Sequence, residues 1–133
     1  MRKAWSIAAA LALVGGPALA ADPTGNWLVK DQTAVIRIAP CADALCGTIA
    51  WTSQPGLDEN NPDPGKRDRP IVGTQIIVGM KPAGGNRWDG EIYNPENGKT
   101  YTGRIILNSA NDLRIEGCVL GFLCGGENWT RTK

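Results

Sequence analysis

Apolar and polar residues alternate along most of the chain, a pattern typical of half-buried β-strands rather than helices. In the segment 33–39, for example, Ala34, Ile36 and Ile38 fall on one face and Arg37 on the other. The pattern predicts eight strands, at 25–30, 33–39, 47–52, 71–79, 87–92, 101–107, 113–117 and 127–132.

Eight short strands joined mostly by tight turns predict an all-β fold, an eight-stranded up-and-down antiparallel barrel. Closure into a barrel removes the exposed sheet edges that an open sheet would have. The 17 glycines and 9 prolines agree with many short elements. A sandwich of two sheets is the structural alternative.

Charged residues on the polar faces predict a register for three of these strands. Placing Ile92 opposite Tyr101 sets Asp89 against Arg104, and the pairing with the next strand sets Arg104 against Glu116. Both registers keep the apolar residues on one face. Each such pair contributes roughly 0.2–1 kcal/mol, enough to bias a register.

Four cysteines, Cys41, Cys46, Cys118 and Cys124, indicate two disulfides, with three connectivities to choose from. Their spacing is loose for a four-thiolate zinc site. Successive loops of an up-and-down barrel alternate ends, so the two cysteine-flanked loops lie at opposite ends. A disulfide cannot span that distance. We therefore expect Cys41–Cys46 and Cys118–Cys124.

The first twenty residues have the pattern of a cleaved signal peptide. Arg2 and Lys3 precede an apolar run over 4–14, and small residues end the segment at Ala20. The run is too short for a membrane anchor, so we expect no membrane span after cleavage. The predicted organisation is a signal peptide over 1–20 and one barrel domain over 21–133, in the periplasm or secreted.

Composition and charge exclude several function classes. The chain has no histidine, which excludes a Ser-His-Asp triad, a Cys-His pair and His-ligated metals. Removing Arg2 and Lys3 leaves 12 basic residues (14 − 2) against 13 acidic ones, a net charge of −1. A near-neutral chain has no electrostatic footprint for nucleic acid. We predict no catalytic residue, no metal site and no cofactor.

The segment 53–70 is an unusually long connection with four prolines and no strand pattern. Such loops are commonly functional or disordered, and we interpret this one as a lid or a surface for a protein partner, with disorder as an open alternative. It does not fit a calcium-binding EF-hand, because Arg69 stands where a bidentate glutamate is required. The candidate contact residues are Asp58, Asn61, Asp63 and Arg69.

Tryptophans on four predicted strands could form the barrel core or the wall of a ligand pocket. Gly90 and Gly103, on the inward face of neighbouring strands, either leave room inside or make space for a tryptophan from across the barrel. The candidate ligand-binding residues are Trp27, Trp51, Trp88, Tyr101 and Ile105.

The motif Gly25-x-Trp27 in the first strand, with Arg131 in the last, resembles the lipocalin and wider calycin pattern. The resemblance implies that Trp27 packs at the closed end of a barrel with Arg131 over it, so that the two residues close the barrel as a pair. A guanidinium stacked on an indole contributes about 0.5–2 kcal/mol.

Nearly the whole chain after the signal also resembles the small exported bacterial proteins grouped as domain of unknown function 2147. The resemblance implies a lipocalin-like barrel and supplies no catalytic residues. Its motifs are Gly25-x-Trp27, Cys46-Gly47-x-Ile49-x-Trp51, Asp58 with Asn61-Pro62-Asp63, Arg69-Pro70-x-x-Gly73, Tyr93-x-Pro95-x-x-Gly98-Lys99-x-Tyr101, Leu113-x-Ile115-x-Gly117-Cys118 and Trp129-Thr130-Arg131.

Three functions from different classes follow. The leading hypothesis is a non-enzymatic exported protein that binds a small hydrophobic or amphipathic ligand, such as a fatty acid or another lipid-like molecule. The alternative is an envelope protein-interaction module with a solid barrel core, acting through the loop 53–70. The third is a carboxylate-based hydrolase that uses the loop acids Asp58 and Asp63.

Overall fold

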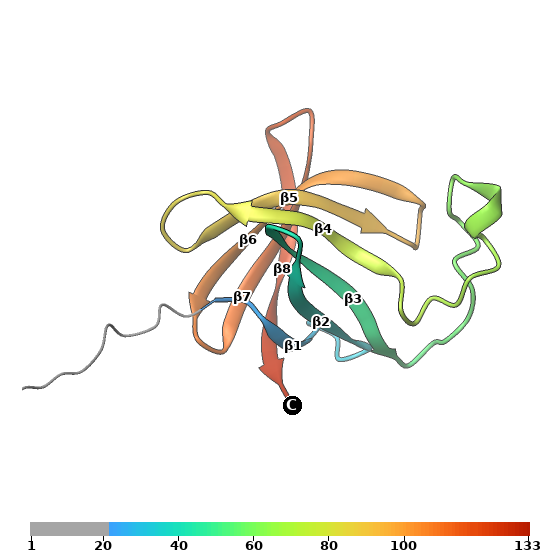
Figure 1. The fold of residues 1–133 in the computed structure, drawn as a ribbon, viewed down its shortest axis with the longest axis horizontal. Coiled ribbons are helices and arrows are strands. Elements are labelled where there is room, and N and C mark those ends of the chain that lie inside the picture. The colour runs from blue at the N-terminus through green and yellow to red at the C-terminus, as the bar shows by residue number, and fades with distance from the viewer. Residues whose placement is uncertain (1–21) are drawn as a thin grey trace, which may run out of the picture.

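Eight antiparallel strands close into a barrel in the computed structural model, which describes residues 22–133 (Figure 1). Each strand pairs with the next along the chain, and β8 pairs with β1. The predicted up-and-down barrel is therefore confirmed, and the sandwich alternative is excluded. The strands are β1 (Gly25–Leu28), β2 (Ala34–Cys41), β3 (Ala44–Thr52), β4 (Gln75–Pro82), β5 (Arg87–Asn94), β6 (Lys99–Ser109), β7 (Asp112–Val119) and β8 (Leu123–Thr132).

The predicted strands correspond one to one with the observed strands, and the largest differences, four residues each, lie at the starts of β4 and β8. Residues 71–74 were predicted as strand, but they complete the long loop that follows β3. The Thr74 hydroxyl donates a hydrogen bond to the Pro70 carbonyl at 2.9 Å, and the Thr74 amide donates to the Ile71 carbonyl at 3.0 Å. These local bonds turn the chain before it enters β4 at Gln75. The predicted signal peptide over 1–20 lies outside the described residues.

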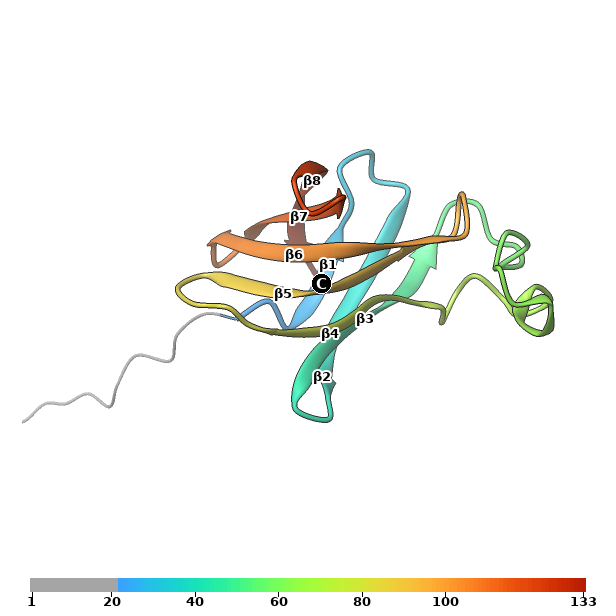
Figure 2. The same ribbon diagram turned by 90° about the horizontal axis from the view of Figure 1, so that it is seen from above.

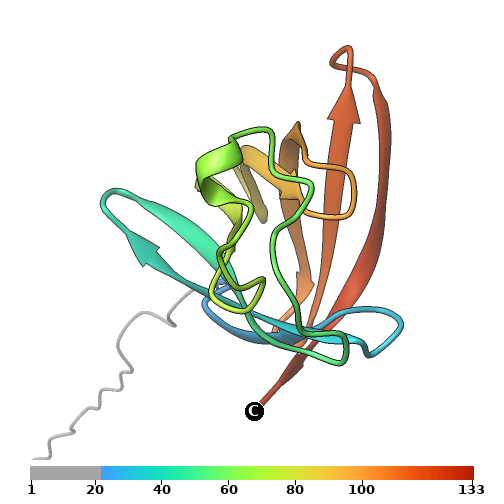
Figure 3. The same ribbon diagram turned by 90° about the vertical axis from the view of Figure 1, so that its right-hand side faces the viewer.

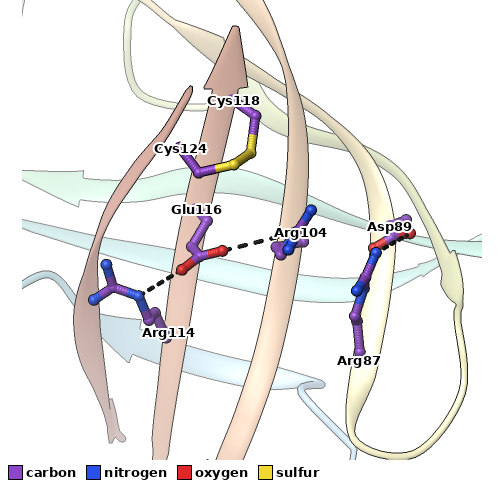
Figure 4. Close-up of polar contacts among 7 residues, drawn as sticks. All are labelled: Arg87, Asp89, Arg104, Arg114, Glu116, Cys118 and Cys124. Atoms are coloured by element: carbon purple, nitrogen blue, oxygen red, sulfur yellow. Dashed lines mark hydrogen bonds and ion pairs between the residues drawn. A yellow bond between two sulfur atoms is a disulfide. The ribbon is translucent and has the colours of Figure 1, made fainter. Parts of the chain in front are cut away.

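The predicted register of β5, β6 and β7 is confirmed, with Asp89 opposite Arg104 and Arg104 opposite Glu116. Figure 4 shows the ion pairs on this outer face. Glu116 accepts from Arg114 at 2.8 Å and lies 3.6 Å from Arg104. Asp89 is paired with Arg87 of its own strand, at 2.9 Å. Hydrogen bonding from Arg87 holds the pKa of Asp89 below its ordinary value.

Both predicted disulfides are present, each across the base of a hairpin tip. Cys41–Cys46 joins β2 to β3, with Cα atoms 5.7 Å apart, and Cys118–Cys124 joins β7 to β8, with Cα atoms 4.0 Å apart. All four cysteines are thereby used, which excludes the zinc alternative. Within residues 22–133 no cluster of three or more acidic, Cys or His residues could hold a metal ion.

The two ends of the barrel differ because successive connections alternate between them. The connections β1–β2, β3–β4, β5–β6 and β7–β8 lie at one end, which we call the open end. The other three connections lie at the opposite end with the start of β1, and we call it the closed end. The long β3–β4 connection carries the short 3₁₀ helix η1 (Pro64–Lys66) and stands out beside the barrel (Figures 2 and 3). Among the described residues no helix is long and apolar enough to cross a membrane.

Trp27 fills the closed end of the barrel. Its side chain is fully buried, and its indole Nε1 donates to the Pro23 carbonyl at 2.8 Å. The Arg131 guanidinium lies over the indole, 4.5 Å from the ring centroid, as the calycin resemblance implied. The same guanidinium donates hydrogen bonds to the backbone carbonyls of Asp22, Thr24 and Ala110.

A row of paired glycines crosses the inner face of β5 to β8. Its members, in strand order, are Gly90, Gly103, Gly117 and Gly125. A Cβ atom at Gly90 would lie 2.7 Å from the Val78 carbonyl oxygen, and one at Gly103 would overlap Ile92. These two glycines therefore allow neighbouring strands to pack closely, and neither faces a tryptophan. A Cβ atom at Gly125 would meet nothing within 4 Å, so the free space lies on the β7–β8 side.

Candidate ligand-binding cavity

A cavity of about 390 Å³ lies beside the glycine row, toward the open end. Gly117 and Gly125 border it, and the turn between β5 and β6 forms part of its rim through Pro95 and Glu96. The missing side chains of the two glycines create room that larger residues would fill. Its walls are mostly apolar side chains from the inner faces of the strands, chiefly Ile77, Ile92, Tyr101, Ile115 and Trp129.

Glu127 supplies a carboxylate to this cavity. Alternation along β8 places Gly125, Glu127, Trp129 and Arg131 on the inner face. The Oε2 atom of Glu127 accepts from the Trp129 indole Nε1 at 2.7 Å and from the Lys30 backbone amide at 3.3 Å. The side chain is half-buried. Glu127 thus orients the Trp129 ring and keeps its second oxygen free of these two bonds.

A second hollow of about 400 Å³ adjoins the cavity on the other side of the β5–β6 turn, and Pro95 and Glu96 line both. Its lining is more polar and includes Asp31, Thr33 and Gln54. Hydrogen bonds from the Thr33 hydroxyl and backbone amide hold the pKa of Asp31 below its ordinary value. Asp31 therefore keeps a negative charge at the rim of the barrel.

The long β3–β4 loop is fixed to the barrel by a buried aspartate. Asp58 is 1% exposed, and its two carboxylate oxygens accept from the Tyr93 hydroxyl at 2.7 Å and from the Asn61 amide at 2.8 Å. Burial, together with the neighbouring Asp58 carboxylate, raises the pKa of Tyr93 to about 12. The Arg67 guanidinium donates to the Asn61 carbonyl at 2.7 Å. The loop therefore has a polar core of its own.

The same loop also holds the rim of the cavity. The Asn60 side-chain amide donates to the carbonyls of Pro95 and Glu96, at 3.1 and 3.0 Å. At the neck of the loop, the Asp58 backbone amide donates to the Arg69 carbonyl at 2.9 Å. The segment 53–70 contributes no residue to the lining of the cavity. It braces the β5–β6 turn at the open end, and its role as a lid stays a prediction.

Of the five predicted ligand-binding residues, Tyr101 lines the cavity. Trp27 is fully buried at the closed end, and Ile105 and the half-buried Trp88 belong to the packed core. Trp51 lies on the outer face and is 48% exposed. The tryptophans of the barrel strands thus lie at different levels and on both faces: Trp27 and Trp88 in the core, Trp129 in the cavity wall and Trp51 outside.

The outward position of Trp51 results from a β-bulge. Ile49 pairs with Ile36, but the next pair along is Trp51 with Val35, so β3 contains one extra residue at this point. A shift of one residue moves a side chain to the opposite face of the sheet. Strict alternation from Ile49 would have placed Trp51 inside.

The four predicted contact residues of the loop divide into two pairs. Asp58 and Asn61 are buried and hydrogen-bonded to each other, and Asn61 also lines a hollow of about 350 Å³ together with Asp63 and Arg69. Asp63 precedes η1, and its side chain accepts from the Gly65 amide at 3.0 Å. Arg69 is exposed. Three of the four residues therefore share one hollow, Asp58 is buried, and the contact surface stays a prediction.

Sequence reasoning missed Glu127 and Trp129 as cavity residues. Both lie within the predicted strand 127–132, and both have the same parity as Arg131. Because the resemblance placed Arg131 inside the barrel, alternation from that residue would have identified Glu127 as an inward-facing carboxylate. The two-residue spacing of Glu127, Trp129 and Arg131 was therefore sufficient to predict that all three face inward.

The tip of the β7–β8 hairpin is an exposed apolar surface that the sequence reasoning also missed. Leu120 is 81% exposed and Phe122 is 73% exposed, with Val119 and Leu123 beside them. The segment 117–126 contains no charged residue. Cys118–Cys124 closes the base of the tip, which extends beyond the neighbouring hairpins in Figure 1.

Comparison with known proteins relates the chain to one family and to one fold. A family model described as "Uncharacterized protein conserved in bacteria (DUF2147)" matches residues 25–131. A solved structure of protein HP1028 from the human pathogen Helicobacter pylori, described as belonging to the lipocalin family, superposes with a TM-score of 0.77. The sequences are 20% identical over 86% of this chain and 85% of that one, so the likeness concerns the fold. The curated proteins give no match.

Proposed function

From the premise that this chain belongs to the bacterial family DUF2147 and has a lipocalin-like barrel, we propose that it binds a small apolar or amphipathic molecule in the cavity beside Gly117 and Gly125. The observation that carries the proposal is the mostly apolar cavity of about 390 Å³ at the open end of the barrel. Binding pockets for small molecules commonly have about 300–1,000 Å³ and apolar walls with a few polar groups.

In this proposal the protein is a carrier and not an enzyme. Tyr101 and Trp129 form aromatic walls for the ligand, and Glu127 is the polar group beside them. The hydrolase hypothesis has little support, because Asp58 is buried and hydrogen-bonded to Tyr93 and Asn61. A general acid or base needs access to its substrate.

The proposed site of action is the periplasm or the outside of the cell, after removal of residues 1–20. The two disulfides support an oxidising compartment. The intact mass of protein isolated from the periplasm tests this directly. We expect the mass of residues 21–133 less four hydrogens, and a mass that includes residues 1–20 would contradict the proposal.

Native mass spectrometry of protein purified without detergent tests ligand binding, by comparison with the denatured mass. We expect a bound mass that is lost on denaturation. Gly125→Val sharpens the test, because a side chain at this position would enter the cavity without meeting protein atoms within 4 Å of its Cβ. The variant should fold normally and lose the bound mass.

Gly56→Val is the matched control, since Gly56 also has open surroundings but lies in the long loop, away from the cavity. It should keep the bound mass. A wild-type protein without bound mass that also fails to take up decanol, an uncharged apolar probe, would overturn the proposed function. Retention of the bound mass by Gly125→Val would place the ligand elsewhere.

A second candidate function is docking to an envelope protein through the β7–β8 tip. The exposed Leu120 and Phe122 favour it, because with Val119 and Leu123 they form a contiguous apolar patch on a clamped hairpin, and such patches mark interaction sites. Crosslinking in the periplasm should give a defined partner that the Leu120→Ser/Phe122→Ser variant loses. The control Leu57→Ser, at an exposed residue of the long loop, should retain it, and equal loss in both would contradict the proposal.

A further inference from the structure

The carboxylate of Glu127 has acceptor capacity that the protein does not use. Both of its hydrogen bonds, from Trp129 and from the Lys30 amide, end on Oε2. Among residues 22–133, no hydrogen bond reaches Oε1 and no ion pair involves Glu127. A half-buried carboxylate against apolar walls is unfavourable unless water or a cation compensates it.

The surroundings of Glu127 contain further acceptors and no compensating cation. The second carboxylate of the lining is Glu96, at the rim, and Asp31 lies in the adjoining hollow. No lysine or arginine side chain lines either space. Arg131, the other charged residue on this face of β8, is engaged with Trp27 at the closed end. The Lys30 contact comes from its backbone amide.

Aromatic rings complete the site. Trp129 and Tyr101 both line the cavity beside Glu127, and aromatic faces attract cations more than anions. A positively charged group next to Oε1 would gain an ion pair and ring contacts together. An anionic head group would instead meet carboxylates on both sides of the β5–β6 turn.

We propose that the cavity selects amphipathic molecules with a cationic head group, such as an alkylammonium, and disfavours fatty acids. The head group pairs with Glu127, and the apolar tail packs between the isoleucines of the wall. This inference rests on the proposed function, and it replaces the fatty acid expected from the sequence with a ligand of opposite charge.

Three probes with the same tail test the inference: decylamine, decanol and decanoate, each titrated calorimetrically into the exported protein at neutral pH below its micellar concentration. We expect decylamine to bind about tenfold or more tighter than decanol, since hydrogen bonds to charged groups exceed neutral ones by about one logarithmic unit of affinity. Decanoate should bind most weakly.

Glu127→Gln removes the charge and keeps an oxygen that can accept from Trp129 and Lys30. It should reduce decylamine affinity about tenfold and decanol affinity much less, so that retained decanol binding shows the cavity to be intact. Glu91→Gln, at an exposed carboxylate outside the cavity lining, is the matched control and should alter neither.

The outcomes separate this inference from the proposed function. Binding of decanol with equal or tighter binding of decanoate than of decylamine would overturn the charge preference and leave ligand binding intact. Failure of all three probes to bind would overturn both. If Glu127→Gln does not fold, the order of the three affinities in the unmodified protein still decides the question.

Discussion

The two ends of the barrel are made from the same strands but do different things. At the closed end, Arg131 lies over Trp27 and donates to three backbone carbonyls. At the open end, Glu127, four residues earlier on the same face of β8, binds two donors through one oxygen. The comparison shows that Arg131 is engaged through all three of its nitrogens at the closed end, whereas Glu127 keeps an unused acceptor at the open end, where we propose that a ligand binds.

The glycine row contains the same contrast on a smaller scale. Gly90 faces the β4 backbone, whereas Gly125 faces open space. One glycine brings two strands together, and the other leaves a volume for a ligand. Residue type alone does not distinguish these roles. The two roles are distinguished by what lies opposite each glycine, which is the β4 backbone for Gly90 and open space for Gly125.

Loss of Trp27 should have the largest effect on stability. Trp27→Ala is expected to reduce the free energy of unfolding by about 3–5 kcal/mol, because it removes a fully buried ring and the stacking surface of Arg131. Chemical denaturation measures the change. Trp51→Ala, at an exposed tryptophan, should cost less than about 1 kcal/mol. Equal costs would remove the distinction between the closed end and the surface.

The glycine row gives the next largest difference. Gly90→Ala is expected to cost about 1–3 kcal/mol, because its Cβ would press on the carbonyl oxygens of Val78 and Gly79, which cannot rotate away. Gly125→Ala should stay within about 0.5 kcal/mol of the unmodified protein. Thermal unfolding of the two variants side by side checks the order, and a reversed order would show that the free space lies elsewhere.

Asp58→Asn should have a smaller effect, on the brace beside the open end. The substitution keeps the shape, but asparagine has one acceptor oxygen where aspartate has two, so it cannot accept from both the Tyr93 hydroxyl and the Asn61 amide. We expect a loss of about 1 kcal/mol in unfolding free energy. Faster proteolysis within the segment 53–70 should accompany it. Unchanged cleavage would show that the loop is held by its other contacts, chiefly those of Asn60.

The last effect is expected only in alkaline solution. The pKa of Tyr93 rises from its ordinary value of 10.0 to about 12, since burial and the Asp58 carboxylate favour the protonated phenol. The resulting stabilisation is fully present below pH 10 and is lost as the pH rises toward 12. In Tyr93→Phe, the free energy of unfolding should therefore fall less between pH 10 and pH 12 than in the unmodified protein. A decline of equal size in the variant would assign it to other groups.

Much of the fold could be predicted because three patterns point to the same topology. They are the alternation of apolar and polar residues, the pairing of charges across strands, and the alternation of successive loops between the two ends of the barrel. The register of Asp89, Arg104 and Glu116 follows from matching two faces at once, and the disulfides follow from which end each loop occupies. These constraints act between neighbouring strands, so they can be read locally.

The cavity could not be predicted in the same way. The position of Trp51 depends on one extra residue in β3, and the role of each glycine depends on a side chain or backbone of the next strand. The burial of Asp58 depends on Tyr93, thirty-five residues away in sequence. Such features arise only after closure, when distant residues come together.

The junction of β1 and β8 has a further consequence, for encounters between molecules. Within residues 22–133, β1 and β8 are the one pair of neighbouring strands that are not consecutive in sequence. The pairing is short, because β1 has only four residues. A barrel that opened there would become a sheet with two unpaired edges, the usual template for strand exchange between copies. Arg131 fastens β8 to the Asp22 and Thr24 carbonyls just before β1, and these hydrogen bonds oppose such an opening.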